Sequence, residues 1–164
     1  MPDDGSIYFE NKNITSLSEK ERTLFRRKRI GFIFQFFNLI PTLTVSENLK
    51  LPLELNSIPF GRVNDMLEEV GLSDRMNAYP DVLSGGEQQR VAVARALIHN
   101  PDFILADEPT GNLDFDTSKQ IIVLIDKIVK QQGKTMIMAT HSKDVMGLAD
   151  RMLTLKDGKF MEVN

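Results

Sequence analysis

The sequence predicts an α/β fold with a mostly parallel sheet, and three short apolar runs separated by helical patterns support that prediction. The runs cover residues 30–34, 103–106 and 135–139, and each has the length of a buried strand. The spacing i, i+3, i+4 and i+7 is apolar before the third run, and before the second run it is apolar except for Arg95, the polar exception on that face. Both patterns predict amphipathic helices. Strands that alternate with helices in this way form parallel sheets.

Length and composition favour one ordinary globular domain. The chain has 164 residues, of which 41% are hydrophobic and 26% charged, and these values are typical of globular domains. The net charge of −3 does not favour a nucleic-acid partner, so we expect none. The absence of cysteine excludes disulfides and thiolate metal sites. The longest apolar-leaning run, residues 30–43, is shorter than the roughly 18 residues that suggest a membrane span.

The N-terminal part predicts a short strand and a helix. Residues 7–9 are typical of a strand and residues 11–13 of a turn. Ser18 and Glu21 have the spacing of a capping box, which predicts a helix to about residue 27. The basic cluster at 26–29 could bind phosphate or lipid headgroups, but we interpret it as a solvated helix end, where cations suit the helix dipole.

Two helices are predicted between the first and second strands. The first covers residues 44–55, with a disturbance at Pro52, and the second covers residues 60–70. Gly71 suits the position that ends a helix. The apolar stripe of the second helix, which we interpret as core, consists of Met66, Leu67 and Val70.

The most informative stretch runs from residue 83 to residue 114. Ser84 is a good N-cap type, and the glycine pair at 85–86 would let backbone N–H groups approach an anion at a helix N-terminus. Asp107 and Glu108 come at the carboxyl end of the second apolar run. In an open parallel sheet, that end of the strands is where ligands bind.

The C-terminal part predicts a helix, a strand and a hairpin. Apolar spacing predicts the helix over about residues 117–131. His141 follows the strand at 135–139, at its carboxyl end. Asp157-Gly158 lies between the two halves of residues 151–163 and is a strong hairpin turn.

Several short motifs along the chain, in the order in which they occur, resemble those of ABC-type ATPases. Residues 83–87, LSGGE, resemble the signature motif; Asp107 resembles the end of Walker B, and Glu108 the catalytic glutamate. Gln35 resembles the Q-loop glutamine and His141 the switch histidine. The resemblance covers nearly the whole chain. The segments ADEPTGNLD and FIFQFFNL are most similar to those of the ATPases of lipoprotein-releasing and macrolide- or peptide-efflux transporters.

The resemblance implies a P-loop NTPase-like core with an inserted helical subdomain at about residues 40–98, which carries the signature. It implies ATP and Mg²⁺ as cofactors, with Asp107 and Gln35 near the metal. Glu108 and His141, with Gln35, would serve hydrolysis, which is phosphoryl transfer. The residues that would bind the nucleotide or border it at a subunit interface are Ser84, Gly85, Gly86, Glu87 and Asp114.

The resemblance also implies partners. Two ATPase subunits would dimerise head to tail, each signature facing the other subunit's ATP, and an integral membrane transporter subunit would bind both. The protein would then be cytoplasmic and peripheral on the inner face of the cell membrane. Phe36, Phe37 and Leu39 are either local core or a docking surface for that membrane subunit, and the sequence leaves both interpretations open.

One family motif is missing from the printed residues. A P-loop needs Gly-x-x-x-x-Gly-Lys-[Ser/Thr], and the nearest match, residues 133–135, has Ile128 in place of the first glycine and enters a strand. We therefore expect the N-terminal P-loop strand and helix to be missing and the chain alone to be nearly inactive. We also expect exposed apolar faces at Ile104, Leu105 and Ile137, and marginal stability.

Two alternative hypotheses remain. The chain could be a non-enzymatic truncated or degenerate fragment that donates its signature motif to an intact subunit. A soluble ABC-type ATPase of DNA repair or translation is disfavoured, because the interval between Gln35 and Ser84 has no room for the long coiled-coil insertion of the repair type. The translation type usually has two cassettes.

Overall fold

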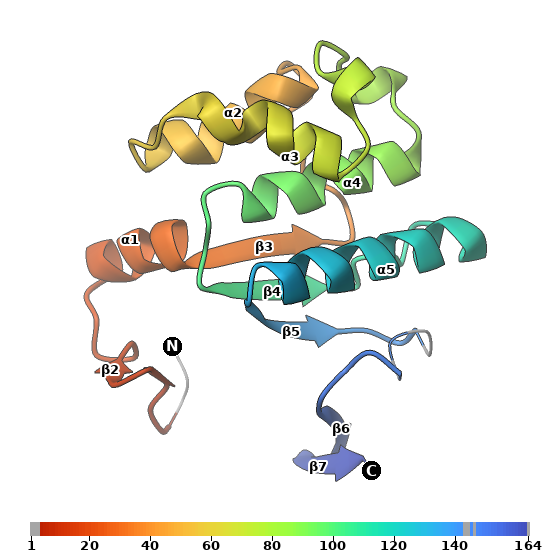
Figure 1. Cartoon of the computed structure of the whole chain (residues 1–164). Coiled ribbons are helices and arrows are strands. Elements are labelled where there is room, and N and C mark those ends of the chain that lie inside the picture. The colour runs from red at the N-terminus through yellow and green to blue at the C-terminus, as the bar shows by residue number, and fades with distance from the viewer. Residues whose placement is uncertain (1–3, 143–144, 146, 164) are drawn as a thin grey trace.

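The computed structural model describes residues 4–142, 145 and 147–163. Its centre is a three-stranded parallel sheet in the order β3-β4-β5 (Figure 1). The strands are β3 (Ile30–Phe34), β4 (Phe103–Asp107) and β5 (Thr135–Ala139). Phe34 pairs with Asp107, which pairs with Ala139, so the three carboxyl ends are level. The predicted α/β class and parallel sheet are confirmed.

Helices cover one face of this sheet in two layers. α4 lies on β3 and contacts α5, while α2 and α3 lie on the far side of α4 (Figure 1). The helices are α1 (Glu19–Arg29), α2 (Val45–Leu55), α3 (Val63–Glu69), α4 (Gly85–Leu97) and α5 (Phe115–Gln131). Short 3₁₀ turns cover residues 60–62, 73–75 and 80–82. The helix predicted over 60–70 is therefore a 3₁₀ turn followed by α3.

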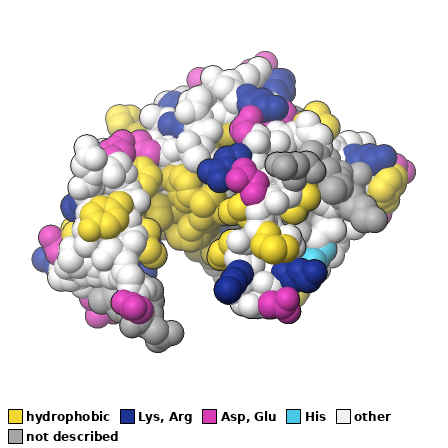
Figure 2. Space-filling model, turned by 90° about the horizontal axis from the view of Figure 1, so that it is seen from below, with side chains coloured by type: hydrophobic (Ala, Val, Ile, Leu, Met, Phe, Trp, Pro, Cys, Tyr) yellow, Lys and Arg dark blue, Asp and Glu magenta, His cyan; other side chains and the backbone are white. Residues whose placement is uncertain are grey.

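The core lies between the sheet and these helices. Ile33, Ile104 and Ala106 point to the helical side and are buried. The expectation that Ile104 is exposed was wrong, because the period of two along β4 turns Ile104 toward the helices and Leu105 toward the other face. Leu105 is half-buried and Ile137 is 60% exposed. Figure 2 shows hydrophobic side chains gathered in a recess on the side away from α4.

β3 and α4 approach each other closely at Gly31. A Cβ at this position would overlap the carbonyl oxygen of Ala96 in α4 and would lie 3.2 Å from Cγ of Pro101. Because both neighbours belong to a packed helix and to the turn that follows it, only glycine fits without displacing the helix. This contact sets the spacing between the sheet and the layer that begins with the signature residues.

Two antiparallel hairpins lie outside the central sheet. β1 (Tyr8–Phe9) pairs with β2 (Lys12–Asn13), and β6 (Met152–Lys156) pairs with β7 (Lys159–Val163). The turn predicted at 11–13 was wrong in part, since the turn lies one residue earlier, where Glu10 has a φ of 52°. The Asp157-Gly158 turn is confirmed, with positive φ at both residues.

Helix caps explain most of the boundaries. Ser18 and Glu21 form the predicted capping box of α1. α5 begins two residues before its predicted start because Asp114 caps it. Pro52 lies inside α2, which continues to Leu55. Among the described residues, none of the helices combines the length and apolar character needed to cross a membrane.

Candidate functional site

The carboxyl edge of the sheet brings together three of the predicted site residues. Gln35 follows β3, Glu108 follows β4, and His141 lies two residues beyond β5. The strands are adjacent, parallel and level, so these residues emerge side by side from one edge. Ligands bind at this edge in open α/β sheets.

Glu108 is held in place by the end of β5. Its backbone N–H donates to the carbonyl of Ala139 at 2.9 Å, and its φ is 43°, in the left-handed region that non-glycine residues seldom adopt. The backbone N–H of His141 donates to Oε2 of Glu108 at 3.3 Å, and Nε2 of His141 lies 3.5 Å from Oε1. The glutamate side chain is 25% exposed, whereas that of His141 is fully exposed. The carboxylate is thus fixed beside a ring that solvent reaches freely.

Gln35 is bound to the loop that follows Glu108. Its Nε2 donates to Oδ1 of Asn112 at 3.1 Å, and Nδ2 of Asn112 donates to the backbone carbonyl of Gln35 at 3.0 Å. The N–H of Gly111 donates to the carbonyl of Glu108 at 3.0 Å. This bond closes a turn that connects Glu108 to Asn112. The sequence places Asn112 in the stretch 111–114, which resembles the family's D-loop, but it did not predict the contact with Gln35, because a single Asn after Gly indicates only a turn.

Arg95 of α4 holds the loop that follows Gln35. Its guanidinium donates to the carbonyls of Asn38 at 2.6 Å and Phe37 at 2.9 Å, and both residues have positive φ. Burial lowers the pKa of Arg95, yet the guanidinium stays charged because the ordinary pKa of arginine lies far above neutral pH. The polar exception on an otherwise apolar helix face is therefore a tether between α4 and this loop.

Burial partly separates the two interpretations of Phe36, Phe37 and Leu39, which are local core and docking surface. Leu39 packs against the core, which confirms the local-core interpretation for that residue. Phe36 is 70% exposed. Phe37 is half-buried and lies near Gly85, at which an added Cβ would be 3.8 Å from the phenyl ring.

The predicted signature residues start α4 with a reciprocal cap. Oγ of Ser84 accepts from the N–H of Glu87 at 3.2 Å, and the N–H of Ser84 donates to Oε2 of Glu87 at 2.8 Å. Arg75 donates to the other carboxylate oxygen at 3.0 Å. The Ser84 backbone first, and then the Arg75 side chain, lower the pKa of Glu87. Glu87 is thus occupied by its own helix start, a role that the S-x-x-E spacing could have indicated.

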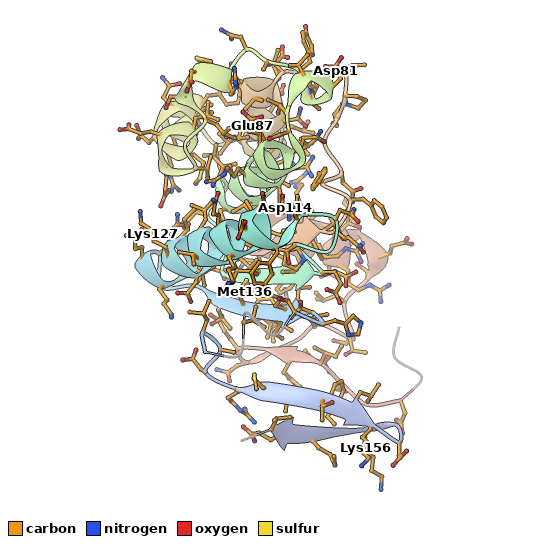
Figure 3. The ribbon with its side chains drawn as sticks, turned by 90° about the vertical axis from the view of Figure 1, so that its right-hand side faces the viewer. Asp81, Glu87, Asp114, Lys127, Met136 and Lys156 are labelled. Carbon is orange, nitrogen blue, oxygen red and sulfur yellow. The ribbon has the colours of Figure 1, made fainter. Side chains whose placement is uncertain are left out.

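A cavity of about 360 Å³ lies between the start of α4 and the loop before α5. It is lined by signature residues 84–87, by loop residues 112–114 and by polar side chains that include Arg90 and Gln120. Figure 3 shows Glu87 on α4 above Asp114 at the start of α5. Asp114 accepts from the N–H of Thr117 at 3.0 Å, and its hydrogen bonds to Thr117 lower its pKa.

The glycine pair lets the signature residues approach this loop. A Cβ on Gly86 would lie 2.7 Å from Cγ2 of Thr117, and one on Gly85 would lie 3.3 Å from Cδ2 of Leu113. The sequence predicted that these glycines admit an anion, and in the fold they also admit α5 and its preceding loop. The absence of a side chain at these glycines serves both the predicted approach of an anion and the close packing of α5.

Oxygen ligands for a metal are present but few. Asp107 is exposed at the end of β4 and pairs in register with Phe34, the residue before Gln35. The part of the chain that the structure describes contains no group of three or more His, Cys, Asp or Glu residues that could hold a metal ion. A site with one carboxylate, that of Asp107, fits Mg²⁺, because this ion takes one or two carboxylates and completes its shell with water and phosphate oxygens.

Known proteins are similar to this chain in sequence and in fold. A family model described as ABC transporter matches residues 1–111. An ABC transporter ATP-binding protein of Mycobacterium tuberculosis is 51% identical, covering 98% of this chain and 66% of the relative. The lipoprotein-releasing system ATP-binding protein LolD of Syntrophus aciditrophicus is 42% identical, covering 98% of this chain and 74% of the relative.

The fold comparison gives the same result. The dimeric post-hydrolysis structure of the ATP-binding cassette MJ0796, bound to ADP and Pi, matches with a TM-score of 0.84 at 39% identity, covering 99% of this chain and 75% of that chain. The present chain spans between about two thirds and three quarters of the length of these three relatives.

Proposed function

Because the chain belongs to the ABC transporter ATP-binding family, we propose that it is the ATP-binding and ATP-hydrolysing subunit of a transporter that drives export or efflux of a lipoprotein, peptide or drug. One observation carries this proposal: Gln35, Glu108 and His141 meet at one sheet edge. The cavity at the signature residues supports it further.

Glu108 would be the general base. Its backbone N–H donates to the carbonyl of Ala139, and its carboxylate accepts the backbone N–H of His141. The carboxylate can accept a proton from the attacking water. His141 would donate a hydrogen bond to the γ-phosphate or to that water, since its exposed ring is free to turn toward a ligand. Phosphoryl transfer needs positioning and charge stabilisation more than covalent chemistry, and both residues could supply these.

Asp107 and Gln35 would hold Mg²⁺. They offer a carboxylate and an amide oxygen from neighbouring strands, and water and phosphate oxygens would supply the other ligands. When bound, Mg²⁺ neutralises charge on the phosphates.

Ser84, Gly85 and Gly86 would bind the γ-phosphate of a nucleotide held by a second subunit. The helix start offers N–H groups and the positive end of a dipole, and a cavity of about 360 Å³ lies beside it. The dimeric form of the MJ0796 cassette supports a two-subunit arrangement. We further propose an integral membrane subunit as partner, with this chain on the cytoplasmic face of the membrane.

Mixing experiments test the signature half of the proposal. This chain would be combined with an intact family cassette in which the second signature glycine has been replaced by aspartate. A composite site can then form only with the signature of this chain. We expect ATP hydrolysis on mixing and its loss with Gly86→Asp in this chain. Gly61→Asp is the matched control, because a Cβ at Gly61 meets nothing within 4 Å. Association of the two proteins without hydrolysis would contradict the proposal.

A second candidate is a non-enzymatic signature donor. It is motivated by the cavity that the signature residues line with the loop before α5, which a donor of this motif would use. A pure donor would not need its own carboxylate, so Glu108→Gln would leave hydrolysis by its native complex unchanged. The enzymatic proposal requires a loss in that complex.

A further inference from the structure

The two hydrogen bonds between Gln35 and Asn112 fix the direction of both side-chain amides. An amide side chain has a donor NH₂ group and an acceptor oxygen, so its orientation decides what it offers to a ligand. The backbone carbonyl of Gln35 can only accept. It receives Nδ2 of Asn112 at 3.0 Å, which turns Oδ1 of Asn112 toward the Gln35 side chain.

The orientation of Asn112 then sets that of Gln35. Oδ1 of Asn112 can only accept, and it receives Nε2 of Gln35 at 3.1 Å. With its NH₂ group committed to Asn112, Gln35 has Oε1 as the atom that remains for a ligand. A hard cation such as Mg²⁺ binds oxygen and not an amide nitrogen, so this orientation is the one that allows metal binding.

Close packing against Gly111 restricts the position of the same amide. A Cβ at Gly111 would lie 2.8 Å from Nε2 of Gln35 and 3.1 Å from its Cδ. The amide of Gln35 therefore lies directly on the backbone of the loop that contains Asn112. This loop also lines the signature cavity through residues 112–114, so Asn112 lies between the cavity and Gln35.

We propose that Asn112 is a positioning residue that presents Oε1 of Gln35, and not its NH₂ group, to the metal. This inference rests on the proposed function, because it assigns a purpose to the amide orientation at the proposed magnesium site. Asn112 acts through Gln35 and does not itself bind the metal. Loss of Asn112 frees the Gln35 amide to turn by 180° and to offer nitrogen instead of oxygen.

Side-chain amide NMR on the full chain tests the proposal. In the wild type, the Gln35 NH₂ signals, assigned by their loss in Gln35→Glu, should show heteronuclear NOE values of a rigid group. Asn112→Leu removes both hydrogen bonds at similar size and should give the averaged signals of a mobile amide. Asn112→Asp keeps an acceptor for Nε2 and should preserve rigidity. Gln120→Leu, which removes another amide from the same cavity lining, should change nothing at Gln35. Thermal melts and backbone spectra establish that each variant is folded.

Mn²⁺ alone, used as a paramagnetic probe, tests the metal part. It should broaden the Gln35 NH₂ signals in the wild type and in Asn112→Asp, and broaden them several-fold less in Asn112→Leu. A Gln35 amide that is mobile in the wild type, or equally rigid in Asn112→Leu, would overturn the orienting role of Asn112. A rigid amide that Asn112→Leu releases but Mn²⁺ never broadens would overturn the metal assignment, and it is the outcome in which the proposed function itself fails at this site.

Discussion

At the scale of single residues, several site positions have two roles at once. Gly86 admits a ligand at a helix start and also admits Thr117 of α5. Glu87 belongs to the signature and also completes the cap of α4. Residue types and spacing predicted the ligand-facing roles of these positions. The packing role of Gly86 depends on Thr117 in another helix, and a single sequence does not indicate it, whereas the cap role of Glu87 lies in the local S-x-x-E spacing.

Gly86→Ala should therefore destabilise the fold even without nucleotide. The new methyl group would lie 2.7 Å from Cγ2 of Thr117, and overpacking of this kind costs about 1–3 kcal/mol. Thr117→Ser removes that γ-methyl group and should restore most of the loss in the double variant. Urea unfolding measures the free energies, with Gly61→Ala as the control at a glycine in open space. Equal stability of the Gly86→Ala and Gly61→Ala variants would refute the packing role.

At the scale of elements, the strands of the central sheet and the helix caps at Ser18 and Ser84 could be predicted, but which face of each strand is covered could not. The apolar run of β4 has no polar residue before Asp107, so its period of two does not reveal which side the helices cover. The expectation failed at Ile104 for this reason and succeeded at Ile137. Likewise, the contacts of Arg95 with residues 37–38 and of Asn112 with Gln35 span 57 to 77 positions in the chain.

Gly31→Ala tests the packing of α4 on β3. The added methyl group would meet the Ala96 carbonyl and Pro101, which are backbone and ring atoms that cannot rotate away. We expect a loss at the upper end of the roughly 1–3 kcal/mol typical of overpacking and a lower midpoint in urea. Gly61→Ala again gives the baseline. A midpoint equal to that of the control would show that α4 moves aside at no cost.

At the scale of the whole molecule, the stability should depend on pH through His99. Burial, opposed in part by the backbone of Ile30, lowers the pKa of His99 from its ordinary value of 6.5. The unfolded chain then binds a proton more readily than the folded chain. Stability is fully present above about pH 6.5 and falls as the pH drops below it toward the lower folded pKa.

The same substitution at each of the two histidines of the chain tests this prediction. His99→Gln should flatten the decline in unfolding free energy between about pH 7 and pH 5.5, a range above the ordinary pKa of carboxylates. His141→Gln, the same change at the other histidine of the chain, is the comparison variant. Denaturant melts at several pH values measure both. A decline that survives in His99→Gln would assign the effect to other groups.

The whole fold also leaves apolar side chains at the face of the sheet away from α4, as expected from sequence at Ile137. Marginal stability of the isolated chain stays a prediction. The hydrolytic role of the carboxyl edge is best tested in the complex that the source cell makes, where every partner is present.

The decisive measurement is ATP hydrolysis by the native complex, purified through a tag at the C-terminus of this chain, with and without Glu108→Gln. Removing a general base should lower turnover by about 10²-fold or more. Glu162→Gln makes the same chemical change at an exposed glutamate paired with Arg151 in the terminal hairpin, and it should leave turnover unchanged. Equal turnover of the Glu108→Gln and wild-type complexes would contradict the account and leave only the signature-donor role.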